Sequence, residues 1–196
     1  MRRLSEPEHF IARVAGSEAG EFGVATSSTA LDGGTHRLTF AVTSTLGLVR
    51  PSRTLDLDTT FLRAAQVVAL PDGWALLYRK GLVPVVAFLD RRAALTGPAR
   101  RLLGASSAFG LARSGDRLAV LAWKKEVADG GGATETAVLR ELDVRGVPVG
   151  PWRCLAPLAP TVPDFGAAIV GDDKGWLVVR TTASGSVALD RVAKSP

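Results

Sequence analysis

The sequence is poor in the side chains from which many enzyme sites are built. Its 196 residues include one cysteine, one tyrosine and two histidines, and aromatic residues make up 6% of the chain. The single cysteine, Cys154, excludes an internal disulfide and a metal site made of cysteines alone. His9 and His36 do not have the spacing of a metal-binding pair. The sequence therefore predicts no metal site and no cofactor.

Nucleophile and phosphate-binding motifs are also missing. No Gly-x-Ser-x-Gly turn occurs, and the glycine spacing of residues 110–115 is followed by Asp116-Arg117, where a phosphate loop needs a lysine and a hydroxyl. The segment Trp152-Arg153-Cys154-Leu155 alternates like a strand, so we expect Cys154 to be a buried structural thiol. The sequence assigns no catalytic residue.

No hydrophobic run is long enough to cross a membrane. The longest comparable run, Leu82 to Leu89, has the length of a strand and contains Pro84, whereas a spanning helix needs about 20 apolar residues. Acidic residues and Pro7 follow the basic N-terminus, unlike the apolar region of a signal peptide. If Met1 is the true start, we expect a soluble, cytoplasmic protein; if the chain is a fragment, its compartment is unknown.

The charge excess is mild and dispersed. The chain has 24 basic and 19 acidic residues, a formal net charge of +5, and no run of more than two basic residues. Nucleic-acid-binding proteins concentrate positive charge on one face or in runs, often beside stacking aromatics. The sequence therefore gives no specific nucleic-acid signal.

The chain is rich in turn residues and short apolar runs. It contains 21 glycines and 11 prolines, spread along its length, and apolar residues make up 46% of it. The dipeptide Phe-Gly precedes a polar turn and an apolar strand at Phe22, Phe109 and Phe165, and a degenerate copy lies at residues 65–69. This repetition predicts one all-β domain over residues 1–196, built of units near residues 16–60, 61–104, 105–156 and 164–196.

Each unit is expected to form one small antiparallel sheet. Hairpin turns are predicted at Asp72-Gly73, Gly115-Asp116 and Lys174-Gly175, where residues that tolerate positive φ stand between apolar runs. A period of about 44 residues with three to four strands fits the blades of a β-propeller, which span about 40 to 50 residues each. We therefore predict a propeller-like fold of about four blades, with a β-sandwich as the alternative.

The two ends of the chain leave the closure of such a ring open. The fourth unit has three expected strands, and the alternating segment His9 to Ala15 belongs to no complete unit. The two ends could together complete one blade. The chain is then either a compact ring of four blades or part of a larger ring.

The units resemble degenerate bacterial β-propeller repeats and are weakly similar to the Phe-Gly-started repeats of integrin-type propellers. The segment Phe165 to Asp173 carries most of this resemblance, continued by residues 176–179 and 185–187. The resemblance implies an Asp-rich calcium loop at the turn. Here only Asp172 and Asp173 remain, beside Lys174, and a calcium ion needs about six oxygen ligands. We therefore expect no calcium at this turn.

Basic residues recur where the second strand of three units ends. If the units are blades around an axis, these residues gather on one face of the ring and create a potential that attracts an anion. Basic residues at strand ends also protect sheet edges without any ligand, and this alternative stays open. The candidate ligand-binding residues are Arg79, Lys80, Lys124, Lys125 and Arg180.

The sequence favours a non-catalytic binding or protein-interaction module that recognises an anionic small molecule or an acidic protein at one face. The alternative is a propeller-type lyase or hydrolase that acts on an acidic sugar, or a fragment with no separate activity. The scarcity of histidine and tyrosine argues against the enzyme, because propeller enzymes of that kind concentrate such residues at the axis.

Overall fold

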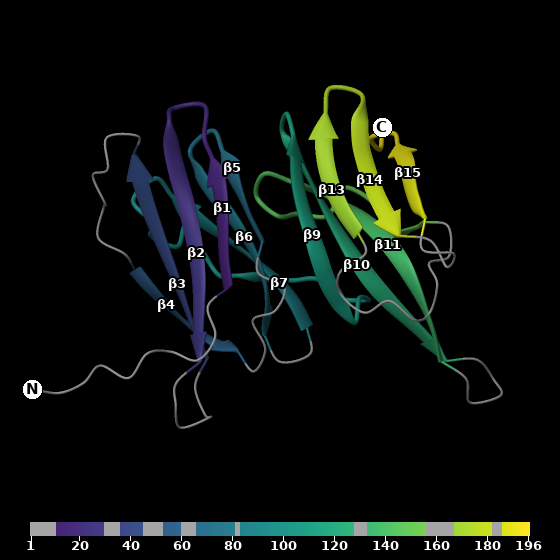
Figure 1. The fold of residues 1–196 in the computed structure, drawn as a ribbon, viewed down its shortest axis with the longest axis horizontal. Helices are drawn as coiled ribbons and strands as arrows, with labels where there is room; N and C mark the ends of the chain where they lie inside the picture. Colours follow the sequence, from purple (N-terminus) through teal and green to yellow (C-terminus); the bar gives the residue numbers. More distant parts are fainter. Residues whose placement is uncertain are drawn as a thin grey trace, which may run out of the picture. The chain divides into compact units, whose positions relative to one another are not determined.

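The computed structural model describes residues 11–29, 36–44, 53–59, 66–80, 83–127, 133–155, 167–181 and 186–196. Within these residues every regular element is a β-strand (Figure 1). The strands form four separate antiparallel sheets, each built from strands that are consecutive in the chain. This confirms the predicted all-β fold of units with three to four strands. Four sheets, instead of two, also argue against the β-sandwich.

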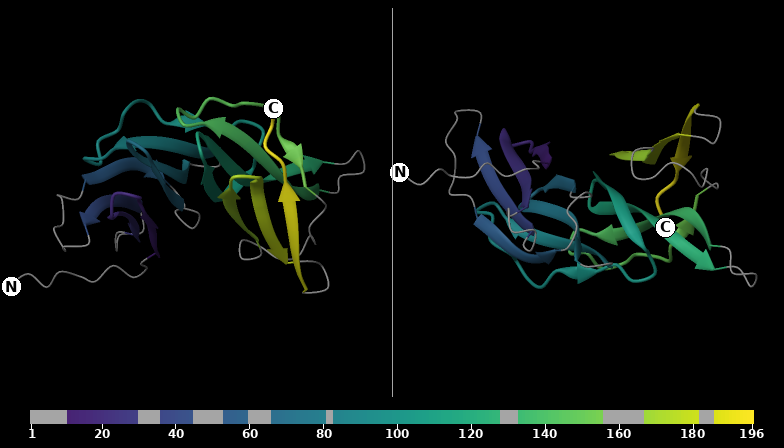
Figure 2. Two further views of the ribbon diagram at one scale, coloured as in Figure 1. Left: turned by 90° about the horizontal axis from the view of Figure 1, so that it is seen from above. Right: turned by 60° about the horizontal axis from the view of Figure 1, so that its bottom comes forward.

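The four sheets are numbered in chain order. The first contains β1 (Ile11–Gly16), β2 (Glu21–Thr29), β3 (His36–Ser44) and β4 (Arg53–Thr59). The second contains β5 (Gln66–Leu70), β6 (Gly73–Lys80), β7 (Val83–Asp90) and β8 (Arg100–Arg101). The third contains β9 (Ser107–Ser114), β10 (Arg117–Val127), β11 (Ala133–Asp143) and β12 (Arg153–Cys154). The fourth contains β13 (Ala167–Asp172), β14 (Gly175–Thr181) and β15 (Val187–Val192), which lie side by side in Figures 1 and 2.

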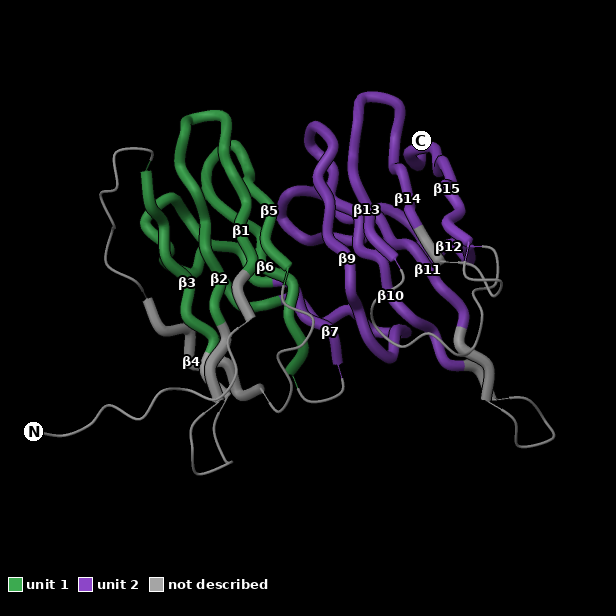
Figure 3. The backbone as a smooth tube through the Cα atoms, viewed as in Figure 1, with its two compact units in different colours: residues 1–81, 87–99 green, residues 82–86, 100–196 purple. Residues whose placement is uncertain are grey.

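The chain divides into two compact units (Figure 3). The first unit comprises residues 1–81 and 87–99 and contains the first sheet and most of the second. The second unit comprises residues 82–86 and 100–196 and contains the third and fourth sheets with β8.

The predicted hairpin turns are confirmed. The pairs Leu70↔Gly73, Ser114↔Arg117 and Asp172↔Gly175 each close a two-residue turn between consecutive strands. At the second of these turns, Gly115 has a φ of 61°, which a glycine adopts without the steric cost of a Cβ atom. The turn residues therefore fix the register of each hairpin locally.

Trp74 holds the two sheets of the first unit together. It lies near the start of the second strand of its sheet and is almost fully buried. Its indole ring lies 5.9 Å from the ring of Phe40 in the first sheet, and a Cβ atom on Gly23 would lie 2.6 Å from that indole. The large ring of Trp74 thus fits where the facing sheet carries only the hydrogen of Gly23.

Trp176 has the same position and role in the second unit. It is fully buried in a cluster that joins the third sheet to the fourth and includes Ala112, Leu121, Leu139 and Ile169. Two glycines allow β9 and β13 to approach closely: a Cβ atom on Gly110 would lie 2.8 Å from Ile169 Cγ2, and one on Gly171 would collide with the backbone of Arg113.

Replacing Gly171 by alanine is expected to lower the free energy of unfolding by about 2 to 3 kcal/mol, the upper part of the usual range for overpacking. The added methyl would lie 2.7 Å from the carbonyl carbon of Arg113, and neighbouring backbone cannot rotate away as a side chain can. Urea denaturation measures the change. Gly97→Ala is the matched control, because nothing lies within 4 Å of the position that its new methyl group would take. Equal stability of the two variants would contradict the close approach of β9 and β13.

The first sheet begins earlier than the Phe-Gly repeat suggested. Residues from Ile11 form β1, paired with β2, so the segment His9 to Ala15 contributes the first strand of a complete sheet. Phe22-Gly23 therefore lies in the second strand of its sheet, whereas Phe109-Gly110 lies in the first strand of its own. The two dipeptides are alike in sequence but occupy different strands of their sheets. A local sequence pattern marks a strand beside a turn, but it does not show whether that strand is the first or the second of its sheet.

The prediction of a buried Cys154 is wrong. The thiol is free and exposed in β12, a strand of two residues at the edge of the third sheet. Alternation does place Cys154 and Trp152 on one side, but so short an edge strand has little covering it. Trp152 is instead held by the hydrogen bond that its indole N–H donates to the Leu103 carbonyl oxygen, at 2.9 Å.

Candidate functional site

Three of the predicted basic residues lie at one end of the paired sheets of the second unit. Lys124 and Lys125 follow Trp123 in β10, and Trp123 pairs with Ser107 at the start of β9. Arg180 in β14 pairs with Ala167 at the start of β13. Because Gly110 contacts Ile169 and Arg113 contacts Gly171, β9 and β13 run side by side in the same direction. Their starts, and the basic residues beside them, therefore share one end of the two sheets.

The other two predicted residues lie together in the first unit. Arg79 and Lys80 are the last two residues of β6, beyond the pair Gln66↔Leu77. Lys80 is exposed, whereas Arg79 is half-buried, and its Nε atom is buried without a hydrogen-bond partner among the described residues. In the second unit Lys124 is half-buried and Lys125 is exposed. The last part of β6 and the last part of β10 thus each carry one half-buried and one exposed basic residue.

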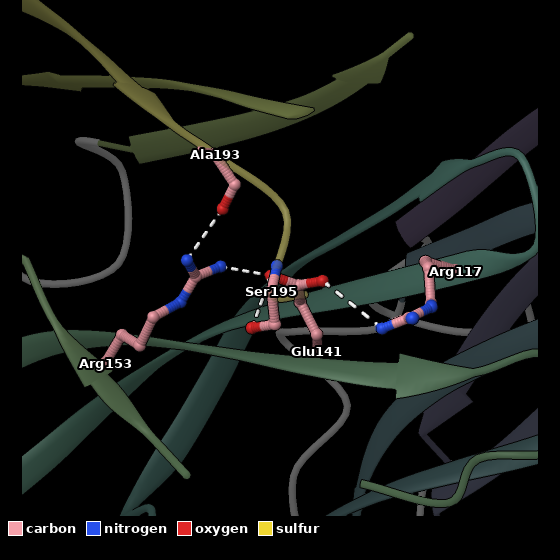
Figure 4. Close-up of polar contacts among 5 residues, drawn as sticks. All are labelled: Arg117, Glu141, Arg153, Ala193 and Ser195. Carbon is pink, nitrogen blue, oxygen red and sulfur yellow. Dashed lines mark hydrogen bonds and ion pairs between the residues drawn. The ribbon is translucent and has the colours of Figure 1, made fainter. Parts of the chain in front are cut away.

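A buried carboxylate lies at the opposite end of the third sheet (Figure 4). Glu141 in β11 is 2% exposed and is the only buried charged residue among those described. Its Oε1 atom accepts a hydrogen bond from Arg153, one from the Ser195 backbone N–H at 2.8 Å and one from the Ser195 hydroxyl at 3.2 Å. Its Oε2 atom lies 3.9 Å from Nη1 of Arg117.

The local sequence explains how Glu141 reaches the interior. In β11, alternation places Glu141 on the same face as Ala137 and Leu139, which are fully buried, and opposite Ala119 of β10. A charge in register with an apolar face needs a counter-charge, which Arg153 and Arg117 supply from the flanking strands. The alternation that puts Glu141 in line with Ala137 and Leu139 could have indicated its burial from the sequence, but no such prediction was made.

The Glu141 cluster joins the C-terminal segment to the third sheet. Arg153 donates one hydrogen bond to Glu141 and another to the Ala193 carbonyl oxygen, at 2.6 Å. Ser195, which lies in the same C-terminal segment as Ala193, donates its backbone N–H to Glu141. With one carboxylate oxygen saturated by three donors and the whole group shielded from water, Glu141 has a structural role and is not placed to exchange protons with a substrate.

A second ion pair lies on the surface of the fourth sheet. Arg191 donates two hydrogen bonds to Asp172, at 2.9 and 2.8 Å. The hydrogen bond from Arg191 is the main cause that lowers the pKa of Asp172, assisted by the Lys174 backbone N–H. The same bond raises the pKa of Arg191. In the second sheet, burial raises the pKa of Tyr78, so this phenol stays protonated at neutral pH.

The described part of the chain offers neither a metal site nor a membrane-spanning helix. No group of three or more histidine, cysteine, aspartate or glutamate residues within the described ranges is placed to hold a metal ion. No helix in this part of the chain is long and apolar enough to cross a membrane.

Four small antiparallel sheets in chain order define a propeller-like protein, and solved structures of that fold match this chain. It aligns with an arabinanase of Bacillus subtilis at a TM-score of 0.50 and 12% identity, over 92% of this chain and 72% of that one. An endo-arabinase of Bacteroides thetaiotaomicron gives 0.54 and 13%, over 100% and 79%. An acylaminoacyl peptidase of Pyrococcus horikoshii gives 0.57 and 11%, over 97% of this chain and 32% of that one. No protein-family model matches the sequence, and neither does any curated protein.

These comparisons confirm the propeller-like fold and correct two predictions. The neighbours include propeller-fold glycosidases and not integrin-type repeats, so the specific likeness to integrin-type propellers is wrong. The prediction of a non-catalytic binding or interaction module is also wrong: the neighbours include arabinanases, which fit the alternative, a sugar-acting enzyme, better than the binding module. Scarcity of histidine and tyrosine does not argue against such an enzyme, because glycosidic bonds are cleaved chiefly by pairs of carboxyl groups, and the chain has 19 acidic residues.

Proposed function

We propose that this chain is a sugar-acting enzyme of propeller fold that cleaves a glycosidic bond in a negatively charged saccharide, by hydrolysis or by elimination. The likeness in fold to arabinanases supports the sugar-acting part of this proposal. The basic strand ends support the charged part. Because fold alone does not specify a reaction, the proposal depends on what these strand ends bind.

The observation that carries the proposal is the common end of β10 and β14. Lys124, Lys125 and Arg180 are brought there from two different sheets by the register of their strands. Cations at one end of packed sheets raise the local concentration of anions and orient a carboxylate group of a substrate. Arg79 and Lys80 are proposed to serve the same purpose at the end of β6 in the first unit.

The Glu141 cluster is excluded from the proposed site on two grounds. Cleavage of a glycosidic bond needs carboxyl groups that reach the scissile oxygen or a water molecule, about 5 to 9.5 Å apart across the sugar. Glu141 is buried and already engaged by Arg153 and Ser195. It also lies several residues along β11 from Thr136, the partner of Lys124, a separation of about 17 Å at the usual rise of a strand.

The test compares neutral and acidic polysaccharides as substrates. We expect the purified chain to release reducing ends or unsaturated products from polygalacturonate faster than reducing ends from arabinan. Replacing Lys124 and Lys125 together by glutamate should raise KM for the acidic substrate about tenfold and leave kcat within about twofold, because charge reversal weakens attraction without moving a reacting group. Arg100→Glu with Arg145→Glu is the matched control, since both residues are exposed and the change in net charge is the same.

The outcomes separate the two parts of the proposal. Cleavage of none of the polysaccharides would overturn the sugar-acting function. Cleavage of arabinan alone, unchanged by the lysine substitutions, would retain that function and reject recognition of an acidic substrate. An equal rise in KM for the control variant would assign the effect to net charge and not to the strand ends.

A further inference from the structure

The fourth sheet carries apolar residues on both of its faces. One face carries Ile169, Trp176 and Val178, which are buried against the third sheet. The pairs Ala168↔Val179, Val179↔Leu189 and Val170↔Leu177 place the other apolar residues together on the opposite face. The apolar residues of this outer face of the fourth sheet are Ala168, Val170, Leu177, Val179, Val187 and Leu189, and the Asp172–Arg191 ion pair lies at one end of the same face.

The outer face of the fourth sheet is strongly exposed in the single chain. Val187 is 72% exposed and Leu189 63%, and Val170 across the sheet is 57% exposed. In the third sheet, by contrast, consecutive residues of β10 that point to opposite faces, such as Val120 and Leu121, are both fully buried. The third sheet is thus buried on both of its faces, whereas the fourth sheet is buried on one face only. A contiguous apolar face of this kind is typical of an interface.

The first sheet carries exposed apolar residues on one face, beside Thr26, Thr39 and Thr43. Val14 is 61% exposed and Phe22 is 37% exposed, and both belong to the face turned away from Trp74. Val14 pairs with Val24 on this face. Of the eight exposed large apolar residues in the described part of the chain, five lie on these two faces. The other three are Leu95, Leu103 and Val147, which lie outside the numbered strands.

We propose that the outer face of the fourth sheet packs on the outer face of the first sheet of a second copy of this chain, and reciprocally. Sheet-on-sheet packing through an apolar face already joins the first sheet to the second and the third to the fourth. The proposed contact repeats that packing between copies. A contact between two different faces must close to avoid a filament, and the proposed dimer of two copies with four sheets each would supply eight sheets to one ring. Eight lies within the usual range of about 4 to 8 blades.

The test uses the mass of the assembly in solution. Sedimentation velocity or light scattering should give about 41 kDa, twice the 20.5 kDa of one chain. Leu189→Glu and Val14→Lys should each shift the protein to the monomer mass, because each places a charge in one of the two apolar faces. Leu103→Glu is the control, since Leu103 is 69% exposed and lies on neither face. Circular dichroism checks that each variant keeps its β-structure.

Mixing the two variants tests which face meets which. In a mixed dimer the glutamate of one copy faces the lysine of the other, and the second contact has the natural residues on both sides. An equimolar mixture of Leu189→Glu and Val14→Lys should therefore recover the dimer that neither forms alone. A wild-type monomer at all concentrations would overturn the proposal in favour of closure within one chain. Loss of the dimer with Leu189→Glu but not with Val14→Lys would overturn it in favour of two fourth sheets packing together.

Discussion

Replacing Glu141 by alanine is expected to lower the free energy of unfolding by about 3 to 5 kcal/mol, the usual cost of removing one partner from a buried ion pair. The change leaves the guanidinium of Arg153 without its anionic partner and removes the acceptor of the Ser195 N–H and hydroxyl. Urea denaturation monitored by tryptophan fluorescence measures the loss.

Two further variants show whether the Glu141 effect comes from the ion pair. Asp173→Ala removes an exposed carboxylate in a turn of the same unit and should change stability by no more than about 0.5 kcal/mol. Glu141→Leu combined with Arg153→Met replaces the pair by apolar groups and should recover part of the loss. A loss below about 1 kcal/mol for Glu141→Ala would contradict the view that this carboxylate holds the C-terminal segment to the third sheet.

Trp176→Ala is expected to cost about 3 to 5 kcal/mol, because truncating a buried tryptophan loses apolar contact and leaves a cavity. The cavity would open between the third and fourth sheets, beside Leu121 and Leu139. Thermal and urea unfolding measure the loss, read from the midpoint at constant slope.

Phenylalanine at the same position is the informative comparison. The buried indole N–H of Trp176 has no hydrogen-bond partner among the described residues. Trp176→Phe keeps most of the ring contact and removes this N–H group, so it should cost much less than Trp176→Ala. Equal losses for the two variants would mean that the indole nitrogen, and not the ring volume, is what stabilises the packing of these sheets.

Much of the fold could be predicted because its signals are local. The turn residues at Gly115 and Lys174-Gly175 and the apolar runs beside them predicted hairpins that the structure confirms. The first strand was assigned to no unit because Phe22-Gly23 matched the other Phe-Gly dipeptides in sequence while lying in the second strand of its sheet.

The candidate sites were predicted less evenly. The basic residues near the ends of β6, β10 and β14 were predicted from the sequence as a binding site, and that role stays a prediction. The Glu141 cluster was not found, because its partners come from β10, β12 and the C-terminal segment, which are far apart in the chain. Cys154 failed for a related reason: alternation gives the face of a residue but not whether anything covers that face.

By itself the sequence determined that this protein is all-β, that it forms small antiparallel sheets, and where most of its hairpins turn. These features could be predicted because φ preferences and the two-residue period of a strand act between near neighbours. Tertiary structure alone decided that Glu141 is buried, that Cys154 is exposed, and that Leu189 and Val14 lie on uncovered apolar faces. Burial depends on which distant segment packs on a face, and no local pattern carries that information.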